Sequence, residues 1–92
     1  MPHTLKEKEK LTLRVRRIRG QIDAIERALA EDQDCGDVLQ LITAARGAMN
    51  GLMAELLEDH VRFHVLDAGR KPTAAQAVAA NELIAIVRSY LR

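Results

Sequence analysis

The chain has 92 residues with a formal net charge of +1, and 48% of them are hydrophobic, so we expect one folded domain over residues 1–92 rather than a disordered chain. Its single cysteine excludes a disulfide within the chain and, without a secretory signal, favours a reducing, cytoplasmic location. No apolar stretch approaches the roughly 18 residues that a membrane-spanning helix needs, so no membrane partner is expected.

The first predicted element is a helix from Leu5 to Ala30. Its apolar residues recur at alternating steps of four and three positions, which is the spacing of a coiled-coil seam. These residues are Leu11, Val15, Ile18, Ile22, Ile25 and Leu29.

Charge is divided unevenly along this helix. Its first half is rich in bases, which are Lys6, Lys8, Lys10, Arg14, Arg16, Arg17 and Arg19. Its second half and the segment after it are mainly acidic, with Asp23, Glu26, Glu31, Asp32 and Asp34. The basic half should attract anions, but an ordinary solvated helix face also carries many charges, so the pattern alone leaves both interpretations open.

A second helix is predicted from Cys35 to about Leu66, after a break at residues 31–34 in which Asp34 is the expected N-cap. The same spacing of apolar residues recurs at Val38, Ile42, Ala45, Met49, Leu52 and Leu56. The middle of this helix contains Gly47 and Gly51, and glycine inside a helix costs roughly 1 kcal/mol relative to alanine. Two such glycines indicate that another backbone passes close by, either the chain's own first helix or a second copy.

A third helix is predicted to begin at Thr73, as its cap, and to reach Leu91, after a turn at residues 67–72. No strand pattern appears, so the predicted fold is all-α: an antiparallel hairpin of two long helices plus a short third helix. Each long helix has an apolar face that one hairpin cannot cover. Two hairpins are therefore expected to pair into a four-helix-bundle dimer.

Histidine and cysteine side chains suggest a metal site shared by two chains. His60 and His64 project from one face of the second helix, where a single histidine would more often be a structural residue. Cys35 lies about 38 Å from His60 along this helix, so one chain cannot bring them together. In an antiparallel dimer with its axis near residues 47–50, Cys35 of one chain meets His3, His60 and His64 of the other. Three imidazoles and one thiolate suit Ni(II) or Co(II), with Zn(II) as an alternative.

A second chemistry uses the same cysteine. Removal of the initiator methionine would leave Pro2 with a free secondary amine, which can condense with an aldehyde to an iminium. A nearby Cys35 thiolate can attack that iminium, so Pro2 and Cys35 together could trap formaldehyde. The simpler interpretation is that Pro2 only precedes the first helix.

Four features of the chain closely resemble the CsoR/RcnR/FrmR family of bacterial repressors. They are the stretch 14–21 (RVRRIRGQ), the position of Cys35, the stretch 46–53 (RGAMNGLM), and His60. The resemblance covers essentially the whole chain. It implies a three-helix fold assembled as a dimer of dimers, which binds DNA without a helix-turn-helix and releases it when an effector binds.

The branches of this family differ in their effector residues. The nickel/cobalt branch uses a His, Cys, His, His set that His3, Cys35, His60 and His64 match. The copper branch has a cysteine where this chain has His64, so Cu(I) sensing is not expected. The formaldehyde branch relies on residues equivalent to Pro2 and Cys35 and usually has an acidic residue at the position of His64. We therefore favour Ni(II) or Co(II), with formaldehyde as the alternative.

The resemblance also suggests how double-stranded operator DNA is bound. A stripe beside the apolar seam is formed by Lys6, Lys10, Arg14, Arg17 and Gln21. Arg14 and Arg17 match DNA-contact positions of the family, and Arg16 and Arg46 are further candidates. Arginines on phosphates would position the duplex, and DNA shape would supply part of the readout.

A metal buffer and an enzyme are the alternatives to a repressor. A helical metal buffer would share the Cys/His site but would not need the basic stripe. An enzyme is least expected, because the sequence has no cofactor loop and no nucleophile–base–acid set.

Overall fold

The structure is a computed structural model, and residues 4–62 and 70–91 are described here. The described residues form three helices: α1 (Leu5–Ala30), α2 (Cys35–His60) and α3 (Ala74–Tyr90). Within the described ranges no residue is in a strand, which confirms the predicted all-α class. None of these helices combines the length and apolar character needed to cross a membrane.

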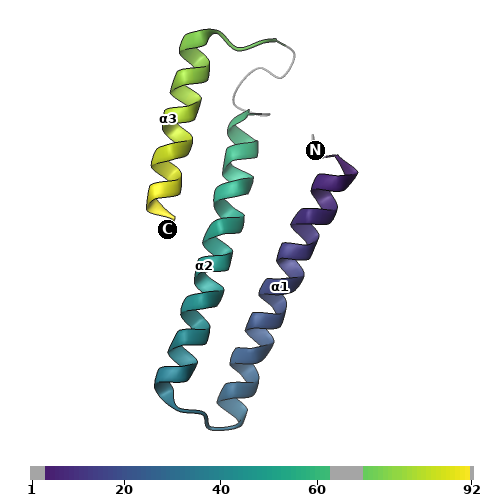
Figure 1. Cartoon of the computed structure of the whole chain (residues 1–92), viewed down its shortest axis with the longest axis vertical. Coiled ribbons are helices and arrows are strands. Elements are labelled where there is room, and N and C mark those ends of the chain that lie inside the picture. The colour runs from purple at the N-terminus through teal and green to yellow at the C-terminus, as the bar shows by residue number, and fades with distance from the viewer. Residues whose placement is uncertain (1–3, 63–69, 92) are drawn as a thin grey trace. The chain divides into compact units, whose positions relative to one another are not determined.

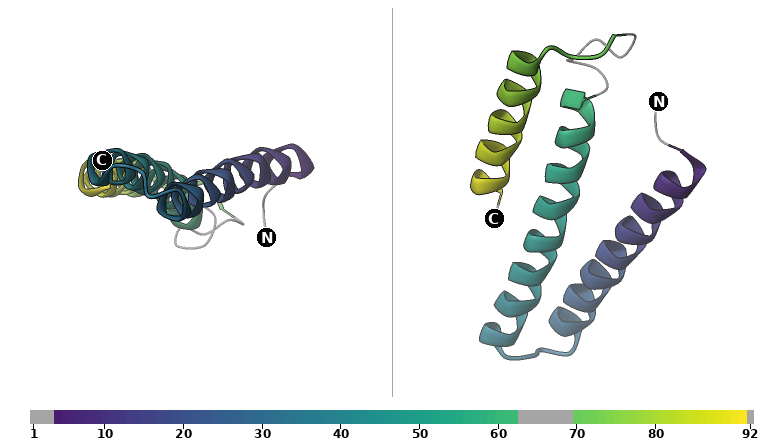
Figure 2. Two further views of the ribbon diagram at one scale, coloured as in Figure 1. Left: turned by 90° about the horizontal axis from the view of Figure 1, so that it is seen from below. Right: turned by 45° about the horizontal axis from the view of Figure 1, so that its top comes forward.

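The chain divides into two compact units. The first contains α1 and α2 as far as Leu52, and the second contains the rest of α2, from Met53, together with α3. In the first unit α1 and α2 run antiparallel on either side of a short connection (Figures 1 and 2). In the second unit α3 runs antiparallel beside the end of α2 (Figure 1).

Threonine caps begin two of the helices. The Thr4 hydroxyl accepts a hydrogen bond from the Glu7 backbone N–H at 3.1 Å, and the Glu7 carboxylate accepts one from the Thr4 N–H at 2.9 Å. Thr73 and Gln76 form the same reciprocal pair at the start of α3, at 3.1 and 2.9 Å. Each pair satisfies two backbone donors that a helix N-terminus otherwise leaves without partners. The predicted start of α1 at Leu5 and the predicted cap of α3 at Thr73 are both confirmed.

A residue in the left-handed region terminates α1. Asp32 has a φ of 52°, and its N–H donates to the Leu29 carbonyl at 3.3 Å. The Gln33 N–H then donates to the Ala28 carbonyl at 3.0 Å. Together these bonds form a Schellman motif, in which glycine usually occupies the place of Asp32. The break predicted at residues 31–34 is confirmed, and this motif is its physical cause.

The end of α2 differs from the prediction. Its α-helical part ends at His60, and residues 61–62 continue it as a π turn. The helix was predicted to reach about Leu66, and residues 63–66 lie outside the described residues. The change coincides with Val61, a β-branched residue whose χ1 freedom is restricted in a helix and which is buried here.

The apolar seam of each long helix divides into two rows. In α1 the first row is buried or half-buried and contains Leu11, Ile18 and Ile25. We call the exposed residues Val15, Ile22 and Leu29 the outer row of α1; they are 43%, 51% and 62% exposed. In α2 the same division separates Val38, Ala45 and Leu52 from an exposed outer row of Ile42, Met49 and Leu56. One hairpin therefore buries only half of the seam that its sequence specifies.

Candidate nucleic-acid interface and metal site

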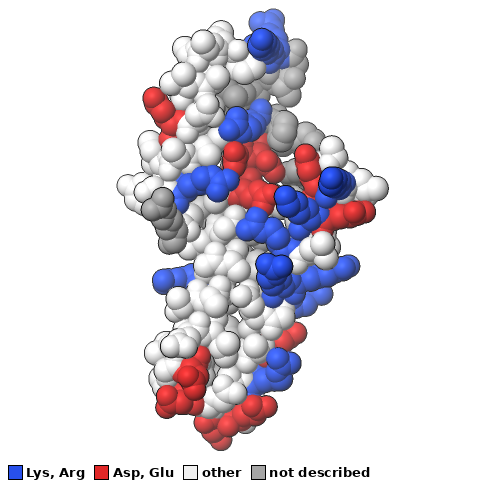
Figure 3. All heavy atoms as spheres, viewed as in Figure 1, with Lys and Arg blue, Asp and Glu red and all other residues white. Residues whose placement is uncertain are grey.

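Basic side chains line α1. Lys10, Arg16 and Arg17 are exposed, and Arg14 is half-buried. On the face drawn in Figure 3, many Lys and Arg side chains gather over α1, while acidic side chains gather at its connection to α2. The basic half and the acidic half predicted from the sequence are thus separated along the helix. The exposed bases can reach the phosphates of a nucleic acid and attract them. Neutral or acidic faces of a helix do not attract phosphates.

The half-buried Arg14 approaches α2 at Gly51. A Cβ atom built on Gly51 would lie 2.9 Å from Nη2 of Arg14. A hollow of about 130 Å³ beside this contact is lined by Arg14, Arg17, Ile18 and Ala48. The guanidinium of Arg14 therefore lies over a position on α2 that has no side chain.

The two glycines in the middle of α2, Gly47 and Gly51, have different surroundings. At Gly51 the close neighbour belongs to the chain's own first helix, but it is the end of the Arg14 side chain and not the backbone that the sequence predicted. At Gly47 a Cβ would meet no described atom within 4 Å, apart from the helix's own nearby backbone. A second copy near Gly47 stays a prediction.

Two other candidate DNA contacts differ from these arginines. Gln21 is half-buried, and its Oε1 atom is buried without a hydrogen-bond partner in the described part of the protein. Arg46 projects from α2 and is exposed. Their roles in DNA binding stay predictions, but the burial of Oε1 distinguishes Gln21 from the exposed bases of the stripe.

Two of the predicted metal ligands lie at opposite ends of α2. Cys35 is its first residue and His60 its last, and both are exposed. Within residues 4–62 and 70–91, no three His, Cys, Asp or Glu side chains gather closely enough to hold a metal ion. His3 and His64 lie outside the described residues, as does Pro2. Both described donors are exposed, and a metal site completed by another chain stays a prediction.

An ion network links α2 to α3 beside His60. The Glu58 carboxylate accepts hydrogen bonds from Arg88 of α3 and from Arg62, the latter at 3.4 Å. Arg62 also donates to Oδ1 of Asn81 at 3.1 Å. The hydrogen bond from Arg88 is the main reason that the pKa of Glu58 lies below its ordinary value; burial opposes this, and the charges of both arginines add to it.

The sequence did not predict this network. The spacing of Glu58 and Arg62, four residues apart on one helix, is a signal that could have predicted their pairing. The partnership with Arg88 has no such local signal, because it depends on how α3 packs on α2.

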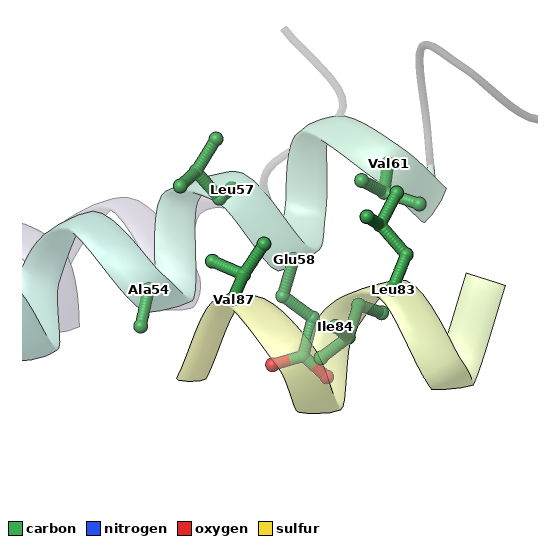
Figure 4. A pocket seen from close by; sticks show the side chains of 7 residues that line it. All are labelled: Ala54, Leu57, Glu58, Val61, Leu83, Ile84 and Val87. Carbon is green, nitrogen blue, oxygen red and sulfur yellow. The ribbon is translucent and has the colours of Figure 1, made fainter. Parts of the chain in front are cut away.

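An apolar hollow lies beside this network in the second unit (Figure 4). Its volume is about 240 Å³, and it is lined by Ala54, Leu57, Glu58, Val61, Leu83, Ile84 and Val87. Glu58 contributes the one ionisable side chain of this lining, and Arg62 and Arg88 already bind its carboxylate. The apolar residues hold α3 against the end of α2, next to His60.

Known proteins resemble this chain along its whole length. Residues 7–89 match the family described as metal-sensitive transcriptional repressors. An uncharacterised protein from the bioA 5′ region of Serratia marcescens is 47% identical over 92 residues, and the transcriptional repressor RcnR of Salmonella arizonae is 36% identical over 92 residues, with both chains covered completely in each case.

A solved structure shares the fold. It is a glutamate-to-histidine variant of the formaldehyde-responsive regulator FrmR from Salmonella enterica serovar Typhimurium, with a TM-score of 0.68 and 43% identity, covering 97% of this chain and 99% of that one. The family match, the full-length relatives and the shared fold agree with one another. The chain belongs to the family of metal-sensitive transcriptional repressors.

Proposed function

We propose that this protein represses transcription by binding operator DNA through the basic half of α1 and releases the DNA when Ni(II) or Co(II) binds. The observation that carries the DNA part is the basic stripe on α1, where Lys10 and Arg17 are exposed and Arg14 is half-buried, with Arg16 exposed in the same half of the helix. Contacts of such side chains with phosphates supply much of the affinity of DNA-binding proteins, and they weaken as salt rises. A cytoplasmic location fits this role.

The effector site requires a second chain. Cys35 and His60 occupy opposite ends of α2, and the outer rows of α1 and α2 are exposed in a single chain. Antiparallel pairing of two hairpins would cover these rows and bring each Cys35 to the His60 end of the partner. A homodimer, and a tetramer made from two dimers, follows from this proposal.

The donor set favours Ni(II) or Co(II). In the proposed site His3, His60 and His64 of one chain and Cys35 of its partner supply three imidazoles and one thiolate, which suit late divalent metals, with Zn(II) as an alternative. The full-length relative RcnR is itself named a transcriptional repressor. The role of the metal is to draw His3 to the end of α2. Since His3 directly precedes Thr4, the cap of α1, this closure would shift the basic stripe and weaken DNA binding.

Formaldehyde is the second candidate effector. The similar FrmR variant, from a formaldehyde-responsive regulator, is 43% identical, compared with 36% for the RcnR relative. In this version the Pro2 amine condenses with formaldehyde, with loss of water, to an iminium that the Cys35 thiolate attacks. His64 then has no part in the response.

Fluorescence anisotropy of the protein on labelled DNA from upstream of its own gene tests the proposal. Ni(II) or Co(II) is titrated into one sample and formaldehyde into another. We expect release by metal, lost in His64→Glu, while that variant still binds DNA. Release by formaldehyde alone, retained in His64→Glu and lost in Cys35→Ala, would assign the response to Pro2 and Cys35.

A metal buffer is separated from a repressor by the same assay. If Arg14→Ala combined with Arg17→Ala abolishes DNA binding and leaves Ni(II) or Co(II) affinity unchanged, the stripe serves DNA. If the wild-type protein binds metal but no upstream DNA, the proposal of a repressor is wrong and the metal buffer is favoured.

A further inference from the structure

Arg14 differs from its basic neighbours on α1 in being held against the other helix. Arg16 and Arg17 are exposed, whereas Arg14 is half-buried and its guanidinium lies over Gly51 of α2. The space between the two is too small for a side chain at position 51, since a Cβ at Gly51 would lie 2.9 Å from Nη2 of Arg14. Any residue other than glycine at position 51 would displace this guanidinium.

The displacement would act on Arg14 rather than on the helix pair. The clashing atom is the far end of a flexible side chain, so it can rotate away without moving the backbone of either helix. Arg14 also borders a hollow of about 130 Å³, which it shares with Arg17, Ile18 and Ala48. A shift of Arg14 would therefore change its placement relative to Arg17.

We propose that Gly51 is a positioning residue for DNA binding: because it has no side chain, Arg14 can lie against α2, where Arg14 and Arg17 present a fixed pair of guanidinium groups to the phosphates. This inference rests on the proposed function as a DNA-binding repressor. A long side chain that is already ordered loses less conformational entropy when it binds. Glycine lowers helix stability, and at position 51 the structure shows what its missing side chain makes room for.

The chain offers a matched control on the same helix. A Cβ at Gly47 would meet nothing within 4 Å, and the same is true of Gly20 on α1. Gly51→Ala and Gly47→Ala gain the same helix propensity, but only the first displaces Arg14. Because Gly47 lies near the predicted dimer axis, sedimentation equilibrium should establish that the assembly is unchanged, and Gly20→Ala provides a second control.

DNA binding of six proteins tests the inference: wild type, Gly51→Ala, Gly47→Ala, Gly20→Ala, Arg14→Ala, and the double variant with Arg14→Ala and Gly51→Ala. We expect Gly51→Ala to weaken binding roughly fivefold and to reduce the salt dependence by no more than about one phosphate contact. Gly47→Ala should bind as the wild type does. In the Arg14→Ala background Gly51→Ala should cause no further loss. Equal losses in both backgrounds, unchanged affinity, or tighter binding by Gly51→Ala would overturn the inference.

Thermal unfolding of the same proteins tests the contact without DNA. We expect Gly51→Ala to raise the Tm less than Gly47→Ala does, because displacement of Arg14 offsets part of the gain in helix propensity. In the Arg14→Ala background the full gain should return. If the Tm shifts of Gly51→Ala and Arg14→Ala simply add in the double variant, and the wild type binds DNA, then the role of Gly51 is wrong while the proposed function stands. A wild type that binds no upstream DNA would instead refute the proposed function, and the DNA role of Gly51 with it.

Discussion

Arg88 of α3 donates a hydrogen bond to the carboxylate of Glu58 on α2, two residues before the candidate ligand His60. Arg62 binds the other oxygen of the same carboxylate. The two arginine side chains are 53% and 44% exposed, and Glu58 is 26% exposed. Exposure at this level limits the energy of such a network to the scale of surface ion pairs.

Replacing Glu58 with glutamine is expected to lower the free energy of unfolding by about 0.5–1 kcal/mol near pH 7. The pKa of Glu58 is lower in the folded chain than its ordinary value of 4.5. The stabilisation is therefore complete above the unfolded value and is lost as the pH falls through the lowered folded pKa. Urea unfolding of the metal-free protein at about pH 7 and about pH 3 measures this change.

The matched control for this prediction is Glu82→Gln on α3, where the side chain is exposed. It should change the stability little at either pH. A Glu58→Gln protein whose deficit is the same at both pH values would show that the ionised carboxylate is not what stabilises α3.

Replacing Asp32 with glycine is expected to stabilise the protein by about 1 kcal/mol. Asp32 has a φ of 52°, a region in which a side chain costs roughly 1–2 kcal/mol and glycine costs almost nothing. Denaturant unfolding followed by circular dichroism gives the difference. Gln33→Gly is the control, because Gln33 has no positive φ and added backbone freedom there should not stabilise. If both variants behave alike, the backbone conformation of Asp32 is not the cause.

Replacing Ile22 with glutamate is expected to dissociate the proposed dimer. Ile22 lies in the outer row of α1 and is 51% exposed in the single chain, so the charge does little harm until a second hairpin covers it. Analytical ultracentrifugation should give a lower mass than for the wild type. Asp23→Lys, an exposed charge change at the next residue, should keep the wild-type mass. A wild-type mass for Ile22→Glu would place the interface elsewhere.

Replacing Arg17 with alanine is expected to weaken binding to upstream DNA and to reduce the slope of log affinity against log salt by about one. Arg17 is exposed in the basic half of α1. The control is Arg27→Ala, an exposed arginine in the acidic half of the same helix, which should leave the slope unchanged. Anisotropy titrations at several salt concentrations measure both. Equal losses for the two variants would mean that general charge, rather than this face, attracts DNA.

The ends of the helices were largely predictable from sequence, because their causes are local. Thr73 caps α3 through a residue three positions away, and the start of α1 depends on Thr4 and Glu7 in the same manner. Hydrogen bonds of this kind join residues within one helical turn, so neighbouring residue types reveal them. The end of α2 was predicted less well, because the α-helix gives way to a π turn at residues 61–62, within the span predicted as α-helix.

Some features of the candidate site were likewise determined by the sequence. Helix length alone places Cys35 and His60 too far apart for one chain, and the sequence therefore determined that a shared site needs a partner. It also determined the polarity of α1, because charge follows directly from residue type.

Only the tertiary structure decided which half of each seam faces inward, that Arg14 lies over Gly51 while Gly47 has no such neighbour, and that Arg88 binds Glu58. These relationships depend on the rotation of each helix about its axis and on which residues of the facing helix lie at the same height. Apolar spacing restricts that rotation to a broad face. Packing of particular side chains then selects one arrangement within it.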